Sequence, residues 1–416
     1  MILSLNETPR VFLGFQAAWL TNSDPHVPLK VLIMSQCVGE EDDGEEIDDE
    51  VEGIEDEEDE EKIPEVHTAE LRQDGVFVAG GEPLAELGYG FSEDGGLVLP
   101  DVSALHLQRR GVLRIYDGQE EVSFDQILHR GLGSDDLFFL RYLVYRDMRS
   151  KGRKIKAGMR KMPYLFFYEK PDRPSSHLVV SYSRNQRIPL GELQDLLSLG
   201  ARFKKGIILA LVDEEGEVSY YEIKKFATRA VDLAGSDRVD IAEVVGPMLV
   251  VWDHEGALSL YKEAYFGKPI GLRKPRAMNF SRPITLSYIE ALYLAERGRV
   301  RLEDLDQSAL KELKQRASEE ENFRERYQVY RMLKESGLIV KSGMKFGVDF
   351  AVYEYGPGID HAPFLIHVYK SDASITPTEI VRAGRLAASV KKKFVVAQVD
   401  QDRDLVLMLS FARIKP

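Results

Sequence analysis

Three side chains near the end of this 416-residue chain are of types that move protons and stabilise negative charge. Tyr353 lies in the run FAVYEY, His361 follows a Gly-Pro-Gly turn, and Lys392 is the middle lysine of the triplet in RLAASVKKKFVVAQVD. Histidine suits a general acid, lysine is a compact cation, and tyrosine becomes a base when a nearby cation lowers its pKa. Such a set suffices to cleave RNA without a metal, because the 2′-hydroxyl can attack its own phosphate.

Each residue also has an ordinary structural explanation. A tyrosine in a strand usually packs, a histidine after a turn is usually exposed and idle, and a lysine triplet at a helix end usually complements the helix dipole. The composition and spacing of the three residues do not decide between these explanations, so the elements around them have to be considered.

The chain contains an internal repeat. RYLVYRDMRSKGRKIKAGM at 141–159 matches RYQVYRMLKESGLIVKSGM at 326–344 at a constant offset of 185 residues, which puts Tyr168 opposite Tyr353. FKKGIILALVD at 203–213 matches VKKKFVVAQVD at 390–400 at an offset of 187, and ALHLQRRGVLRI at 104–115 matches ALYLAERGRVRL at the same offset. The repeat predicts one unit over about 72–232 and a second over 240–416.

Each unit is predicted to contain two subdomains, an N-terminal one at 240–315 and an α/β one at 320–416 in the second copy. The run MLVVWDHEGALSLYKEAYFG indicates a strand-rich piece, followed by a helix around TLSYIEALYLAERG. A long amphipathic helix ends near Gly337, and strands follow. The next helix, PTEIVRAGRLAASVKK, has Thr376 as N-cap and Pro377 at its first position. The predicted class is mixed α/β, with an order close to ααββαββ in the second subdomain.

The charge of the chain is concentrated in one segment. The net charge is −14, but residues 39–62 hold 17 acids and one lysine, and the rest has 54 basic and 52 acidic side chains. This acidic run cannot bury a core, so residues 1–71 are interpreted as an extension with a disordered acidic segment. A solubilising insert is the simpler role for the segment, and occupation of a basic groove in place of RNA is the alternative.

Several classes of protein are disfavoured. No apolar run reaches the length of a membrane span, and the start MILSLNETPR has no secretion signal. Cys37 is the single cysteine of the chain, which excludes an intrachain disulfide and a cysteine-based zinc cluster. We expect a cytoplasmic protein with no metal or other cofactor.

The ordered context of the three residues resembles a known family. The second copy reads as a helix, then G-x-x-V-K-x-G-x-K-F-G-x-D-F-x-V-Y-E, H-x-x-F-L, R-L-A-x-S-V-K-K and a strand ending in V-D. This succession resembles the catalytic domain of the archaeal tRNA-splicing endonucleases. The two units resemble the homodimeric form of that family, in which a degenerate unit is fused to an active one. The resemblance covers about 72–416 and implies excision of introns from precursor tRNA at bulge–helix–bulge motifs, leaving 2′,3′-cyclic phosphate and 5′-hydroxyl ends.

The resemblance also implies roles for individual residues. It makes Tyr353 the general base, His361 the general acid and Lys392 the charge-stabilising cation, and Arg385 the arginine that stacks on a bulged base. A second stacking arginine is expected from the family, with Arg403 and Arg413 as candidates.

The first copy keeps two of the three groups, Tyr168 and Lys205. Pro174 falls opposite His361, and His177 falls opposite Phe364, so the first unit is predicted to be a scaffold unless a shifted loop delivers His177. The family also uses an acidic loop to dock into another unit. The residues that would form this loop are Asp213, Glu214, Glu215 and Glu217, although an ordinary acidic hairpin turn would look the same. Two active sites related by a two-fold axis would suit a substrate with two bulges.

Two other functions remain as alternatives. A non-catalytic RNA-binding or assembly subunit is disfavoured because all three groups are present in the second copy. A metal-dependent DNA nuclease of similar topology needs clustered acidic ligands on strands, which the second copy's core strands lack.

Overall fold

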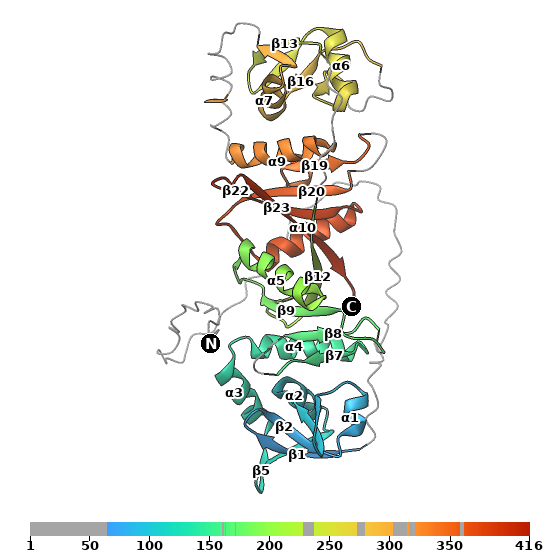
Figure 1. The fold of residues 1–416 in the computed structure, drawn as a ribbon, viewed down its shortest axis with the longest axis vertical. Helices are drawn as coiled ribbons and strands as arrows, with labels where there is room; N and C mark the ends of the chain where they lie inside the picture. The colour runs from blue at the N-terminus through green and yellow to red at the C-terminus, as the bar shows by residue number, and fades with distance from the viewer. Residues whose placement is uncertain are drawn as a thin grey trace, which may run out of the picture. The chain divides into compact units, whose positions relative to one another are not determined.

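The structure is a computed structural model of the chain. It describes residues 65–416 apart from 160–161, 163, 171, 228–236, 273–278, 303–313, 316–318, 320–321 and 358–361. The chain divides into two compact units, 1–55 and 56–416, and all described residues belong to the second. The acidic run at 39–62 and the sequence before it lie outside the described residues. The described part is a mixed α/β protein built from two repeated units, as the sequence predicts (Figure 1).

The N-terminal subdomain of the second unit has a five-stranded sheet of order β15-β16-β14-β13-β17. Its elements are β13 (Asp240–Val245), β14 (Met248–Val251), α6 (His254–Ala264), β15 (Lys268–Pro269), β16 (Ile284–Leu286), α7 (Tyr288–Glu296) and β17 (Val300–Leu302). The subdomain is rich in strands, as predicted. The run MLVVWDHEGALSLYKEAYFG itself is strand only over β14, because α6 follows. The Asp253 side chain accepts a hydrogen bond from the Gly256 amide, and this N-cap starts the helix.

The N-terminal subdomain of the first unit has a six-stranded sheet of order β3-β4-β2-β1-β5-β6. Its elements are β1 (His67–Arg72), β2 (Gly75–Ala79), α1 (Glu82–Glu86), β3 (Phe91–Glu93), β4 (Gly96–Leu99), α2 (Asp101–Arg109), β5 (Leu113–Asp117), β6 (Glu120–Val122) and α3 (Phe124–Ser134). In both subdomains the first strand pairs in parallel with the last strand of the βαβ segment, β1 with β5 and β13 with β17.

The second subdomain of the second unit begins with α9 (Phe323–Glu335), and Gly337 just beyond it has a φ of 75°. The predicted cap at Thr376 is confirmed: its hydroxyl accepts the Glu379 amide, and Pro377 is the first residue of α10. Among the described residues, one helix precedes the strands of this subdomain, where the predicted order has two. Two short strands that were not predicted, β18 and β21, are also present. The elements after α9 are β18 (Ile339–Ser342), β19 (Phe350–Tyr353), β20 (Phe364–Lys370), β21 (Ser374–Ile375), α10 (Pro377–Ser389), β22 (Lys393–Asp400) and β23 (Leu405–Ile414).

The first unit repeats this arrangement. Its elements are α4 (Phe138–Ser150), β7 (Ile155–Ala157), β8 (Leu165–Phe167), β9 (His177–Ser183), β10 (Ile188–Pro189), α5 (Leu190–Phe203), β11 (Gly206–Val212) and β12 (Val218–Lys225). Both units contribute to one ten-stranded sheet of order β18-β19-β20-β22-β23-β12-β11-β9-β8-β7, in which each half mirrors the other (Figure 1).

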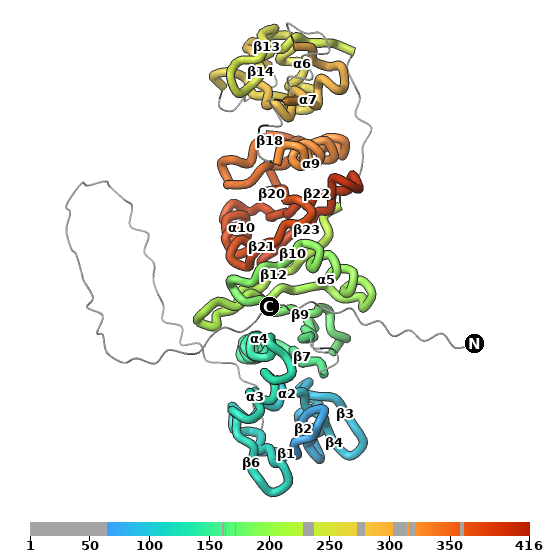
Figure 2. Tube along the Cα trace, turned by 90° about the vertical axis from the view of Figure 1, so that its left-hand side faces the viewer, coloured from blue at the N-terminus to red at the C-terminus, as the bar shows by residue number. Residues whose placement is uncertain are grey.

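The two halves of the sheet meet where β12 pairs with β23, antiparallel. Ile223 lies opposite Phe411 there. Ile223 pairs with Ile207 in its own unit, and Phe411 pairs with Phe394, the 187-residue counterpart of Ile207. The pair therefore joins corresponding positions, as on a two-fold axis. The short strands β10 and β21 lie side by side (Figure 2), and there Ile188 pairs with Ile375, again at an offset of 187 residues.

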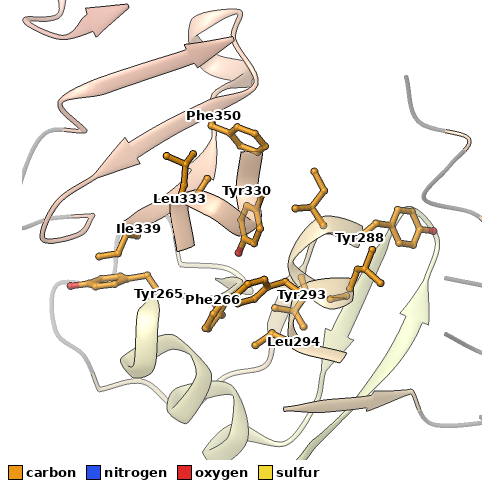
Figure 3. Close-up of a cluster of buried hydrophobic side chains, with 14 of the residues drawn as sticks. Tyr265, Phe266, Tyr288, Tyr293, Leu294, Tyr330, Leu333, Ile339 and Phe350 are labelled. Carbon is orange, nitrogen blue, oxygen red and sulfur yellow. The ribbon is translucent and has the colours of Figure 1, made fainter. Parts of the chain in front are cut away.

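Helices cover both faces of the sheet. Alternate residues of a strand point to opposite faces, and Leu209 packs with the α5 and α10 residues whereas Ala210 packs with α4. In the second unit α9 packs on the sheet and also on the N-terminal subdomain, in one continuous cluster. Figure 3 shows this cluster, with Tyr330 and Leu333 of α9 near Tyr293 of α7.

Candidate active site

The end of α10 determines where Lys392 lies. Lys391 has a left-handed backbone with φ of 54°, its amide donates to the Ala388 carbonyl at 3.0 Å, and the Lys392 amide donates to the Ala387 carbonyl at 2.7 Å. These are the two hydrogen bonds of a Schellman motif, which ends a helix and turns the chain sharply. The turn delivers Lys392 directly before β22.

The ammonium group of Lys392 is held beside the start of β20. Its Nζ donates to the Ala362 carbonyl at 2.8 Å and lies 5.7 Å from the centre of the Phe346 ring. Ala362 immediately follows His361 in the sequence. His361 itself lies outside the described residues, so the structure gives no geometry for the expected acid. The structure does place the expected cation, Lys392, in a hydrogen bond with the backbone carbonyl of Ala362, the residue after His361.

Tyr353 and Lys392 lie at the same end of three neighbouring strands. Val352 of β19 pairs with Phe364 of β20, and Phe364 pairs with Lys393 of β22, so these residues form a row across the sheet. Tyr353 and Lys392 each lie one residue beyond this row. Neighbouring strands are about 4.8 Å apart, so the two backbones are about 10 Å apart, within reach of two long side chains.

Tyr353 is half-buried at the end of β19, where it pairs with Ile339 of β18. Its side chain packs against the cluster under α9 and against the cluster under α10. Tyr261 belongs to the first of these clusters, and its pKa is raised by burial first, and then by Tyr265 and Tyr353. The expected base therefore lies where the two subdomains of the second unit meet.

The first unit has the same row of three residues, made by Phe167, His177 and Gly206. This register places His177 at the position of Phe364, in agreement with the sequence alignment. His177 is a strand residue whose Nδ1 lies 2.8 Å from the Ser176 hydroxyl and whose Nε2 lies 3.4 Å from the Glu222 carboxylate. It does not occupy the place that corresponds to His361.

Lys205 repeats the geometry of Lys392 in the first unit. Its Nζ donates to the Ser175 carbonyl at 2.6 Å, and Ser175 is the 187-residue counterpart of Ala362. Neither acceptor was singled out from the sequence, because every residue has a carbonyl and side-chain chemistry gives no signal for it. The pKa of Tyr168 is raised, by burial first, which opposes a role as base.

Arg385 is exposed on α10, seven residues before Lys392 and about one turn before the helix ends at Ser389. The preceding residue, Gly384, packs on the ring of Tyr221 of β12; burial raises the pKa of that phenol, and Arg413 and Arg385 oppose the rise. Arg413 lies directly opposite Tyr221 in the β12–β23 ladder. Arg403 is in the β22–β23 turn, 3.7 Å from Asp400. Of the two candidates for a second arginine, Arg413 is the one close to Arg385.

The expected docking residues form the β11–β12 turn. Asp213 is committed to the turn itself, because its Oδ1 accepts the amides of Glu215 and Glu217 at 3.0 and 2.9 Å. Glu214 forms an ion pair with Arg184. The side chains of Glu215 and Glu217 are exposed at the tip, which leaves two carboxylates for contact with another molecule.

The described residues contain no group of three or more His, Cys, Asp or Glu side chains that could hold a metal ion. No helix in the described ranges has both the length and the apolar character of a membrane span.

Two family models match the chain. The model described as tRNA intron endonuclease, catalytic C-terminal domain, matches residues 138–220 and 323–407, one segment in each unit. The model described as tRNA intron endonuclease, N-terminal domain, matches residues 241–313.

Individual relatives are similar over most of the chain. A tRNA-splicing endonuclease of Methanosarcina acetivorans is 30% identical over 358 residues, covering 83% of this chain and 99% of its own. That of Methanococcoides burtonii is 30% identical over 329 residues, covering 76% and 90%. A tRNA-splicing endonuclease of Hyperthermus butylicus is 46% identical over 159 residues, which are 38% of this chain and 88% of its own.

Proposed function

This chain belongs to the tRNA-splicing endonuclease family, and we propose that it excises introns from precursor tRNA by cutting at bulge–helix–bulge motifs. The observation that carries the proposal is the row Val352–Phe364–Lys393, beyond which Tyr353 and Lys392 lie at one end of the sheet. The strand order thus gathers the two groups that composition and spacing alone left unconnected.

In the proposed reaction Tyr353 takes the proton of the 2′-hydroxyl, and the 2′-oxygen forms a bond to its own phosphorus. The bond from phosphorus to the 5′-oxygen breaks, and His361 gives that oxygen a proton. Lys392 stabilises the extra negative charge on the pentavalent phosphorane. The products are a 2′,3′-cyclic phosphate and a 5′-hydroxyl, and no metal enters the reaction.

The assembly we propose is a homodimer. The first unit lacks an acid at the place of His361, since Pro174 aligns there, and it acts as a scaffold. Arg385 stacks on an unpaired base of each bulge. Each chain contributes one active site, so two chains present two sites to a substrate with two bulges.

The test uses paired variants of the two units. Wild-type protein is incubated in EDTA with a bulge–helix–bulge RNA, alongside His361→Ala with His177→Ala as its control, and Lys392→Ala with Lys205→Ala. We expect two cuts, slowed about 100-fold or more by each second-unit change, the usual contribution of a general acid. The first-unit changes should leave the rate unaltered. End analysis should find a cyclic phosphate on the 5′ fragment.

Failure of well-folded wild-type protein to cut in EDTA would contradict the proposal. If cutting returned with added Mg²⁺, the metal-free chemistry would be wrong. If no condition gave cutting while the RNA still bound, the chain would be a non-catalytic subunit. Equal slowing by His177→Ala and His361→Ala would place an acid in the first unit.

A further inference from the structure

Tyr265, at the end of α6, has an unusual backbone. Its φ is 56°, in the left-handed region that glycine favours and that bulky residues rarely adopt. The side chain is buried. Strained backbone of this kind persists only where the surroundings enforce it, and it concentrates at functional sites.

The corresponding turn of the first unit has a glycine. Arg149 of α4 lies over the Tyr89 ring at 3.9 Å, and Lys334, its 185-residue counterpart in α9, lies over the Phe266 ring at 4.2 Å. In the first unit the residue directly before Tyr89 is Gly88, with a φ of 80°. In the second unit the residue directly before Phe266 is the strained Tyr265. The unit predicted to be catalytic therefore has a tyrosine where the scaffold unit has the unstrained choice.

The Tyr265 ring lies against the segment that follows Tyr353. A Cβ atom added at Gly356 would lie 2.4 Å from Cζ of Tyr265, so the ring fills the space beside the Gly356 backbone. Gly356 comes three residues after Tyr353. Tyr261 makes an edge contact with Tyr265, with ring centres 5.2 Å apart. Tyr265, backed by Tyr261, thus packs on the segment that directly follows the base.

A partly buried ion pair holds the turn that presents this ring. Lys341 of β18 donates from Nζ to the carbonyls of Tyr265 and of Gly267, the latter at 2.8 Å. Glu290 of α7 accepts the Gly267 amide at 3.0 Å and lies 3.4 Å from Lys341 Nζ. In Figure 3 Tyr265 lies on the side of the cluster where Ile339, the pairing partner of Tyr353, is found.

We propose that Tyr265 is a positioning residue: its ring fixes the backbone at Gly356 and thereby the orientation of the Tyr353 phenol toward the RNA. This inference rests on the proposed function for its effect on rate, but the contact itself can be tested without RNA. The N-terminal subdomain of the second unit then contributes to the active site through packing, while that of the first unit does not.

The decisive variants are Tyr265→Leu and Tyr89→Leu, which shorten buried tyrosines at corresponding turns of the two units. Both should lower the melting temperature. At a temperature where both are folded, Tyr265→Leu should lower the single-turnover cleavage rate about 10- to 100-fold, as misplacement of a reacting group does, with unchanged affinity for RNA. Tyr89→Leu should cleave at the wild-type rate. Gly356→Ala, which overpacks the same contact from the other side and also strains the backbone at a φ of 129°, should reproduce the slow cleavage.

Hydrogen–deuterium exchange of the peptide spanning 353–357 gives a second readout. It should be faster in Tyr265→Leu and unchanged in Tyr89→Leu. Equal rates and equal exchange in the two leucine variants would overturn the inference, and the proposed function would stand. If the wild type does not cleave RNA, the proposed function fails, and the exchange comparison alone decides whether Tyr265 positions the strand end.

Discussion

The buried histidine of the first unit links stability to pH at the scale of a single residue. His106 lies between the rings of Tyr89 and Tyr145. Burial, reinforced by Arg149 and the neighbouring arginines Arg110 and Arg146, lowers its pKa from 6.5 to about 3. Between these values the unfolded chain binds a proton that the folded chain does not. Stability is therefore fully present above about pH 6.5 and falls with pH, by at most about 1.4 kcal/mol per unit.

We predict that His106→Phe weakens the dependence of the free energy of unfolding on pH below about pH 6.5. Urea unfolding from pH 7 to pH 4 should show a smaller loss of free energy of unfolding in the variant than in the wild type. His129→Phe, at an exposed position of α3, controls for the loss of one histidine. Parallel pH curves for His106→Phe and the wild type would show that the folded protein binds the proton as readily as the unfolded chain.

The seam between the units depends on a close helix–strand contact at the scale of elements. Gly384 of α10 packs on Tyr221 of β12, and a Cβ added there would lie 2.4 Å from the ring. Gly384→Leu should displace α10 and destabilise the protein by about 1–3 kcal/mol, the usual cost of overpacking. Ala388→Leu, at an exposed position of the same helix, should cost less. Thermal unfolding measures both, and equal losses would mean that the contact is not tight.

The same elements show how far the sequence could predict the structure. The helix caps at Thr376 and Gly337 were predictable because capping depends on local side chains. The continuous sheet was not, because β12 and β23 join through backbone hydrogen bonds that any apolar strand can make. The strained backbone of Tyr265 was not predictable either, since tyrosine gives no signal for a left-handed turn. The candidate site residues were identified from ordered motifs. That Tyr353 and Lys392 lie at the same end of the sheet became evident only from the register of the strands.

At the scale of the whole molecule, the tip of the β11–β12 turn is expected to determine the oligomeric state. Glu215 and Glu217 are exposed there, while Asp213 is engaged in the turn. We predict that wild-type protein has twice the 47.1 kDa mass of one chain, and that the double change Glu215→Lys and Glu217→Lys gives a monomer. If this turn is the docking loop, reversed charges there would be repelled by a partner surface that is complementary to its carboxylates. Sedimentation velocity measures both masses.

The control for this variant is Asp402→Lys, in the corresponding turn between β22 and β23, where the aspartate is also exposed. That change should leave the mass doubled, because the expected docking residues lie in the first unit's turn. Loss of the dimer in the Glu215 and Glu217 variant should also abolish paired cutting of a two-bulge RNA, since one chain supplies one site. A charge-reversed protein that remained dimeric would place the interface elsewhere. A wild-type monomer that cut both bulges would remove the need for a partner.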